Sequence, residues 1–187
     1  MRVFGIDPGS QCTGYGCVDS DGRRHQLVLC GAVRAGVADT FPEQLSMIYR
    51  ELSALIAAQR PDCVVIESIF HAVNARSALK LGHARGVAML AATEAGVTVI
   101  EYTPAEIKRS VVGYGRAEKP QVGQMVKLLL GLDAVPTPHD AADALAVAIC
   151  HVHQSGVIAA AGARTRAAEP RGAASPRSWR QYRPTTR

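Results

Sequence analysis

Short apolar runs separated by turn residues open the chain. Residues 3–7 form the first run, and it ends at Asp7-Pro8-Gly9-Ser10, a sequence typical of a turn. Residues 13–19 and 25–34 are predicted to be two further strands, joined by a hairpin turn at Asp21-Gly22. This part of the chain is therefore expected to form a three-stranded meander.

Helical spacing of apolar residues begins after this meander. Residues 42–59 place Leu45, Ile48, Leu52 and Leu55 on one face of a predicted helix. The remaining elements are then predicted to alternate, with strands at 63–67 and about 97–101 and helices at 75–95, from Thr103-Pro104, at about 121–131, and from Thr137-Pro138 to about 153. This order predicts an α/β fold: a mixed five-stranded sheet flanked by helices on both faces.

Residues 154–187 differ in composition from the rest of the chain. They are mostly Ala, Gly, Arg, Ser and Pro, with seven arginines and one acid, Glu169. Such a segment buries too little apolar surface to offset the entropy lost on ordering. We predict one domain over residues 1–153 and a flexible Arg-rich C-terminal tail over residues 154–187. The tail then accounts for the net charge of +5, because residues 1–153 hold 14 Lys/Arg against 15 Asp/Glu.

Two further features of the composition concern the cellular compartment. No apolar run approaches the roughly 20 residues of a membrane span, and the N-terminus has no pattern of a secretory signal. The five cysteines include no Cys-x-x-Cys pair, which favours reduced thiols that act as small apolar residues. We expect a cytoplasmic protein with no membrane segment.

Four acidic residues stand at positions that are unusual for carboxylates. Asp7 and Glu67 each end an apolar run, and Asp140 and Asp143 open an alanine-rich helix. Strand ends in βαβ-like arrangements meet at one edge of the sheet, so the four acids are expected to converge. Carboxylates about 5 Å apart repel by ~3 kcal/mol per pair at an effective dielectric near 20. Convergence would require cations or protons, and all-oxygen ligands suit Mg²⁺ or Mn²⁺.

Each acid taken alone also has a structural explanation. Asp7 before Pro-Gly could serve only the turn, and Glu67 could be a strand-end charge that reaches solvent. Asp140 could complete a capping box with Thr137, and acids near a helix N-terminus are favoured by ~0.3–1 kcal/mol each. The joint arrangement, with Asp140 and Asp143 on one helix face, instead indicates a two-metal site for in-line attack on a phosphodiester.

Several segments resemble the RuvC family of bacterial Holliday-junction resolvases. The match spans about residues 1–153 in the expected order. The segments that carry it are Gly5-Ile6-Asp7-Pro8-Gly9-Ser10, Thr13-Gly14-Tyr15-Gly16, Ile66-Glu67 with Phe70, Asn74 to Gly82, Ala84-Arg85-Gly86, Val111-Val112-Gly113, Ala117-Glu118-Lys119 and Asp140 to Ala146. The resemblance implies an RNase H-like fold and a homodimer that nicks two strands of a four-way junction symmetrically, leaving 5′-phosphate ends, in homologous recombination and DNA repair.

The resemblance also implies a role for the acids. Asp7, Glu67, Asp140 and Asp143 would be the catalytic carboxylates that bind two Mg²⁺ ions, with Mn²⁺ as a substitute. A Mg²⁺-activated water would attack the scissile phosphate, and the second ion would stabilise the leaving 3′ oxygen. Some family members have His in place of Asp140. His139 precedes that position here but faces about 100° away on a helix, which favours a supporting or surface role.

Candidate DNA contacts follow from the same resemblance. Phe70 would be an exposed wedge that stacks on bases at the junction centre, worth ~1–3 kcal/mol per base, whereas core packing is the alternative for a lone Phe. Lys108 and Lys119 match basic positions of the family. A solvated face is the alternative for every member of the full set of candidate phosphate contacts, which comprises Arg76, Lys80, Lys108, Arg116 and Lys119.

Small residues mark the predicted helix at 75–95. Ala78, Gly82 and Gly86 would allow a second helix to approach closely, and the resemblance implies a two-fold dimer interface suited to a two-fold substrate. Packing on the sheet is the alternative. The resemblance further implies four-way junction DNA and a branch-migration complex of RuvA and RuvB as partners. The tail could add salt-sensitive DNA affinity or be dispensable.

Two other functions compete with junction cleavage. One is a different RNase H-like nuclease that processes ribosomal RNA precursors, against which the helix at 75–95 and the Phe70 loop argue. The other is a non-catalytic junction-binding protein, against which the intact set of four acids argues. An actin-like ATPase shares the fold family, but the sequence has no second or third phosphate loop.

Overall fold

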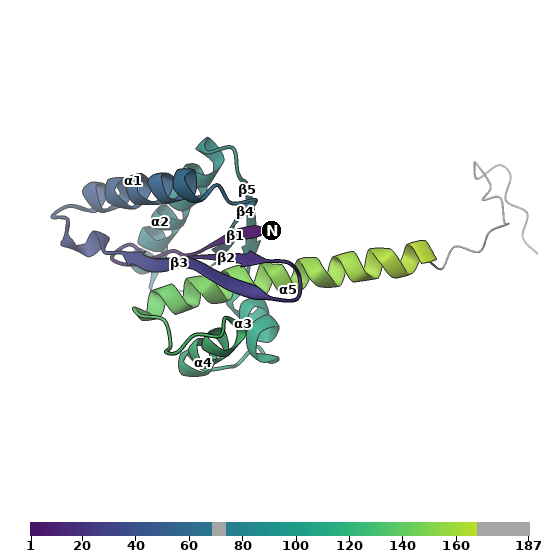
Figure 1. Cartoon of the computed structure of the whole chain (residues 1–187). Coiled ribbons are helices and arrows are strands. Elements are labelled where there is room, and N and C mark those ends of the chain that lie inside the picture. The colour runs from purple at the N-terminus through teal and green to yellow at the C-terminus, as the bar shows by residue number, and fades with distance from the viewer. Residues whose placement is uncertain (69–73, 168–187) are drawn as a thin grey trace, which may run out of the picture. The chain divides into compact units, whose positions relative to one another are not determined.

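The computed structural model describes residues 1–68 and 74–167, with side chains up to residue 156. The chain divides into two compact units, Met1–Gly156 and Val157–Arg187. The first unit holds a sheet and the helices that cover it (Figure 1). Its strands are β1 (Arg2–Asp7), β2 (Thr13–Ser20), β3 (His25–Val33), β4 (Cys63–Glu67) and β5 (Thr98–Tyr102).

The five strands form one mixed sheet in the order β3-β2-β1-β4-β5. Strands β1, β2 and β3 are antiparallel neighbours, as expected for a meander. Strands β4 and β5 run parallel to β1 and are reached through helices. The prediction of a mixed five-stranded sheet is confirmed.

Helices alternate with the later strands and begin close to the predicted positions. They are α1 (Phe41–Gln59), α2 (Ala75–Glu94), α3 (Pro104–Val112), α4 (Lys119–Leu129) and α5 (His139–Ala167), and a short 3-10 turn, η1 (Ala35–Val37), precedes α1. As predicted, Thr103 caps α3, where it forms a capping box with Glu106. None of the described helices is long and apolar enough to cross a membrane.

Helix α5 was predicted to end near residue 153, but it continues to Ala167. The added part is rich in Ala and Arg, which are strong helix formers, so local propensity extends the helix. The division into a domain over residues 1–153 and a tail over residues 154–187 stays a prediction.

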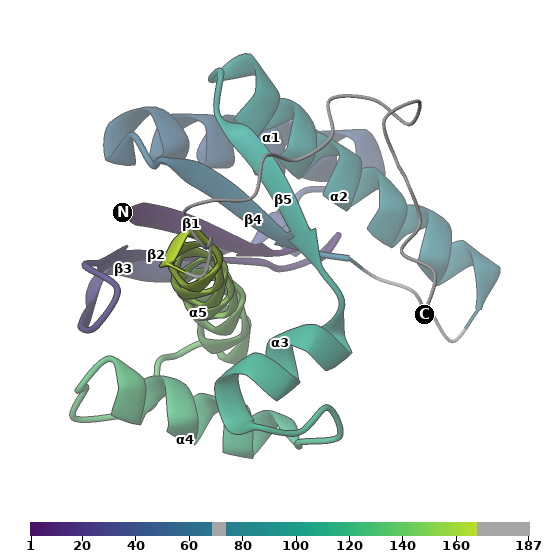
Figure 2. The same cartoon turned by 90° about the vertical axis from the view of Figure 1, so that its right-hand side faces the viewer.

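Alternating side chains give the sheet two apolar faces. Phe4 and Ile6 of β1 pack against α1 and α2, together with their neighbours on β4. Val3 of β1 and Val65 of β4 point the other way and pack against α3, α4 and α5. Figure 2 shows the sheet between these two helical layers, which confirms helices on both faces.

Candidate active site

The register between β1 and β4 brings two of the predicted acids together. The two strands are parallel, and Ile6 pairs with Ile66, so Asp7 and Glu67 follow at the same level. Both acids share the strand face of Val3 and Val65, because side chains alternate along a strand. Asp7 and Glu67 therefore point toward α5.

Glycines in the strands allow α5 to lie directly on this face. A Cβ atom at Gly5 would lie 2.1 Å from the Ala144 carbonyl oxygen, and one at Gly14 would lie 2.0 Å from the Asp140 carbonyl oxygen. No other residue permits so close an approach. Glycine inside a strand is the signal that could have revealed this contact from the sequence. The first turns of α5 thereby carry Asp143 to the ends of β1 and β4.

Asp7, Glu67 and Asp143 act on one another electrostatically. Burial raises the pKa of Asp7 to about 8, together with repulsion from Glu67, a hydrogen bond with Glu67 and the charge of Asp143. Burial and the charge of Asp143 also raise the pKa of Glu67. Without a cation, Asp7 thus retains a proton at neutral pH and shares it with Glu67.

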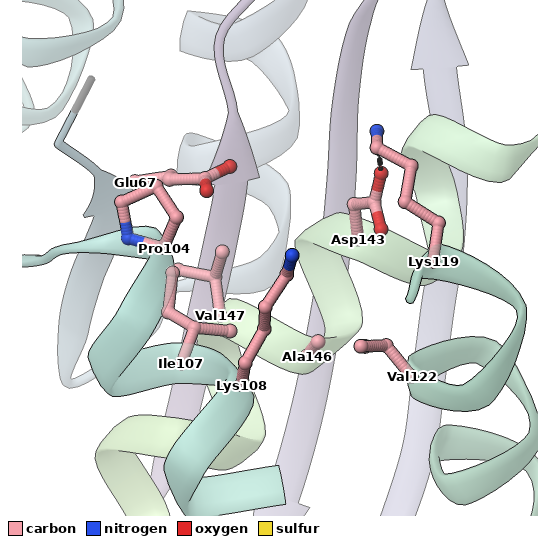
Figure 3. A pocket seen from close by; sticks show the side chains of 9 residues that line it. All are labelled: Glu67, Pro104, Ile107, Lys108, Lys119, Val122, Asp143, Ala146 and Val147. Carbon is pink, nitrogen blue, oxygen red and sulfur yellow. Dashed lines mark hydrogen bonds and ion pairs between the residues drawn. The ribbon is translucent and has the colours of Figure 1, made fainter. Parts of the chain in front are cut away.

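Lys119 supplies the positive charge for the third acid. Its Nζ donates to Oδ2 of Asp143 at 2.6 Å (Figure 3). The Lys119 side chain is 70% exposed, whereas that of Asp143 is 15% exposed. Desolvation opposes protonation of Lys119, but the hydrogen bond to Asp143 and the surrounding acids raise its pKa overall. A predicted DNA contact is therefore paired with a catalytic candidate.

A cavity of about 160 Å³ lies beside these groups. Glu67 and Asp143 line it together with Lys108, whose side chain points toward the space between the two acids (Figure 3). Most of the remaining wall is apolar, and the sequence does not predict it, since it comes from packing between α3, α4 and α5. This apolar part consists of Pro104, Ile107, Val122, Ala146 and Val147, and Lys119 completes the lining.

Asp140, the fourth acid, has a different partner. The thiol of Cys12 donates to Oδ2 of Asp140, with 3.1 Å between sulfur and oxygen. Burial, this hydrogen bond and the charge of Asp140 raise the pKa of Cys12 to about 11. All five cysteines are free, and Cys17, Cys63 and Cys150 are buried as expected. The expectation of an apolar role is wrong for Cys12.

The acids suit a divalent cation in type but are not preassembled around one. Within residues 1–68 and 74–167, no three His, Cys, Asp or Glu side chains are arranged to hold a metal ion. The oxygen donors nevertheless match the preference of Mg²⁺ and Mn²⁺. A proton on Asp7 and the ammonium of Lys119 reduce the repulsion among Asp7, Glu67 and Asp143. A bound divalent cation would reduce the same repulsion.

The other predicted DNA contacts lie apart from the cavity wall. Arg76 and Arg116 are exposed, and Lys80 places Nζ 5.3 Å from the ring centroid of Phe41. His139 is exposed at the start of α5, which fits a surface role. Phe70 falls outside the described residues.

Helix α2 presents its small residues to an open apolar groove. Ala78, Gly82 and Gly86 line this groove, and the large side chains beside them, Leu79 and Leu90, are 65% and 49% exposed. A Cβ atom at either glycine would meet nothing within 4 Å, so packing on the sheet does not explain them. That packing is made by other small residues, namely Ala84, Ala88, Ala91 and Ala92.

Comparison with known proteins agrees with this geometry. The family model described as "Crossover junction endodeoxyribonuclease RuvC" matches residues 3–151. A protein of that name from Koribacter versatilis is 54% identical over 159 residues, which cover 84% of this chain and 96% of the relative.

Solved structures show the same similarity. RuvC from Thermus thermophilus superposes with a TM-score of 0.77 at 34% identity, covering 84% of this chain and 96% of that one. A structure of the Thermus thermophilus protein in complex with a Holliday junction substrate gives 0.77 at 32% identity, with the same coverage.

Proposed function

The chain belongs to the RuvC family of crossover junction endodeoxyribonucleases, and we infer from this membership that it is an endonuclease that resolves Holliday junctions. The observation that carries the inference is the family match over residues 3–151, which includes all four acids of the proposed site. The predicted RNase H-like architecture agrees with the structural similarity to Thermus thermophilus RuvC. The chain thus acts on DNA during recombination and repair.

Asp7, Glu67 and Asp143 form the centre of the proposed site, and Asp140 is the fourth carboxylate. Their oxygens would hold divalent cations, which we propose to be two Mg²⁺ ions with Mn²⁺ as a substitute. Cations held in this way activate water and stabilise the leaving oxygen of a phosphodiester. Support comes from the raised pKa values of Asp7 and Glu67. They mean that the ionised carboxylates are unfavourable on their own, and a bound cation would stabilise them.

Lys119 and Lys108 are proposed to contact the phosphate backbone next to the scissile bond. If Asp143 held a cation, the exposed Lys119 ammonium would be released from its ion pair and could contact a phosphate. Lys108 already points into the cavity between Glu67 and Asp143. DNA contacts by Phe70, Arg76, Lys80 and Arg116 stay predictions.

A homodimer is part of the proposal, with a second copy of this chain as the occupant of the α2 groove. The exposed Leu79 and Leu90 beside open glycines support it, because a helix can approach small residues closely and cover the leucines. A two-fold dimer would present two sites to a two-fold junction. Binding of RuvA and RuvB stays a prediction from the family.

The two competing functions are less well supported. A nuclease for ribosomal RNA precursors does not fit a chain that belongs to a family of junction endonucleases. A non-catalytic junction-binding protein would have no need for three mutually repelling carboxylates beside a cavity. The retained acids therefore favour catalysis.

Cleavage of defined substrates tests the proposal. The wild-type chain should cut a synthetic four-way junction at paired sites only with Mg²⁺, and should leave linear duplex and RNA–DNA hybrid largely uncut. Asp143→Asn should abolish cleavage while junction binding, measured by gel shift in Ca²⁺ or EDTA, stays nearly intact. Preferred cutting of the hybrid would contradict junction resolution. Equal loss of cleavage and binding in Asp143→Asn would assign Asp143 a folding role instead.

A further inference from the structure

A rigid loop places Cys12 against the start of α5. The loop joins β1 to β2, and buried Thr13 closes it: Oγ1 donates to the Gly9 carbonyl oxygen at 2.6 Å and accepts from the Gly9 amide at 3.3 Å. The loop is also tight, because a Cβ atom at Gly9 would lie 2.1 Å from the Cys12 carbonyl oxygen. Cys12 therefore has little freedom to move.

Asp140 is equally constrained along its backbone. Its carbonyl oxygen lies against Gly14 on β2, which leaves no room even for a methyl group there. What remains adjustable is the side-chain rotamer of Asp140. The hydrogen bond from the Cys12 thiol to Oδ2 restricts that rotamer.

The thiol is a well-defined partner for this carboxylate. Among the residues that the structure describes, no other group donates a hydrogen bond or forms an ion pair with the Asp140 side chain. A carboxylate that accepts at one oxygen still offers its second oxygen to a cation. Groups that hydrogen-bond metal-binding carboxylates orient them, and their loss lowers metal affinity about 10–100-fold.

We infer that Cys12 is a positioning residue whose thiol holds the Asp140 carboxylate so that its second oxygen is presented as a metal ligand. The inference rests on the proposed role of Asp140 in metal binding. The cysteine acts on the cation only through Asp140.

Mn²⁺ binding to the full chain without DNA, followed by electron paramagnetic resonance of free Mn²⁺, tests this role. Cys12→Ala and the bulkier Cys12→Val should each weaken binding about 10-fold or more, because neither residue donates. Cys12→Ser should retain most of the wild-type affinity, because a hydroxyl can donate in place of the thiol. The control Cys30→Ala removes a half-buried cysteine on β3 and should leave binding unchanged.

A double-mutant cycle separates the possible failures. In an Asp140→Asn background, Cys12→Ala should have no further effect if it acts through Asp140. Two outcomes would overturn the positioning role and leave the metal site standing. In the first, Cys12→Ala weakens Mn²⁺ binding equally in the wild-type and Asp140→Asn backgrounds. In the second, Asp140→Asn weakens Mn²⁺ binding but Cys12→Ala keeps the wild-type affinity. Unchanged binding in Asp140→Asn would overturn the ligand role of Asp140 and the inference together.

Discussion

At the scale of single residues, Asp7 shows what a buried carboxyl costs this protein. The strand end removes it from water, and Glu67 lies beside it, so its pKa rises to about 8. Lys119 forms an ion pair with Asp143, although the Lys119 side chain is mostly exposed. The negative charge is thus compensated by a proton at Asp7 and by the Lys119 ammonium at Asp143, at the site where a divalent cation would bind.

The raised pKa of Asp7 predicts how stability depends on pH. The folded chain without metal keeps a proton that the unfolded chain loses above its ordinary pKa near 4, so stability should fall as pH rises from about 4 to about 8. Asp7→Asn removes this loss and should be more stable than wild type at pH 8, by on the order of a few kcal/mol. Urea unfolding in EDTA between pH 5 and pH 8 measures the difference.

Mg²⁺ provides the control for this prediction. At pH 8 it should raise the melting temperature of wild type more than that of Asp7→Asn, because only wild type has the full acid set. An equal rise in both proteins would refute a metal site that includes Asp7.

At the scale of elements, the contact between α5 and the sheet positions the site. Two glycines, Gly5 and Gly14, leave room for the helix backbone, so Asp143 reaches the ends of β1 and β4 without a long side chain. Farther along α5, His153 packs beside His25 of β3, with 5.4 Å between ring centroids. Helix α5 therefore carries Asp143 of the acidic site at one end and the His153–His25 contact farther along.

Gly14→Ala tests the close approach. Its methyl group would lie 2.0 Å from the Asp140 carbonyl oxygen, so α5 must shift, at a cost of roughly 1–3 kcal/mol for overpacking. Thermal unfolding should show the loss, and Mg²⁺-dependent cleavage should fall as well. The control Gly156→Ala lies on α5, where the added methyl group meets nothing within 4 Å. This variant should leave stability unchanged or raise it by up to ~1 kcal/mol. Similar behaviour of the two variants would contradict this account of Gly14.

The histidine contact predicts a second pH dependence. Nδ1 of His153 donates to the Ser110 carbonyl oxygen at 3.1 Å, and Nδ1 of His25 lies 2.9 Å from Ser20 Oγ. Burial and then the charge of His153 lower the pKa of His25, against weaker opposing effects of a backbone hydrogen bond and of Asp21. The folded chain therefore takes up a proton at His25 less readily than the unfolded chain.

Stability should accordingly be lost as pH falls below about 6.5, the ordinary pKa of histidine. His25→Gln should show a smaller drop in melting temperature between pH 7 and pH 5 than wild type. The exposed His139 offers a matched control, and His139→Gln should follow wild type. If His25→Gln loses as much stability as wild type over this range, the contact does not carry the pH dependence.

At the scale of the whole molecule, the α2 groove is the feature that a lone chain leaves unexplained. Leu79→Asp or Leu90→Asp places a charge on that groove and should convert the proposed dimer to monomers in analytical ultracentrifugation. Leu128→Asp is a matched control, because Leu128 is 70% exposed on α4, outside the groove. Dissociation by the Leu128 change alone would place the interface elsewhere. Dissociated protein should also lose paired cutting of a junction.

Local patterns were enough to predict most of the architecture. Alternating and helical spacing indicated the strands and helices, and capping residues such as Thr103 marked a helix start, because these signals act between residues close in sequence. Asp7 and Glu67 could be named for the same reason, since each ends an apolar run. The sequence does not predict the full length of α5, because a segment of alanines and arginines with few large apolar residues has the composition of both a helix and a disordered tail.

Long-range packing decided the rest. The partner of Asp140 is Cys12, 128 positions away, and the partner of Asp143 is Lys119, 24 positions away. Neither pairing can be derived from spacing, because each depends on how closely α5 and α4 approach the sheet. The sequence therefore determined which acids stand at strand and helix ends. Tertiary structure alone decided which groups pair with these acids, because the pairing depends on distances set by packing.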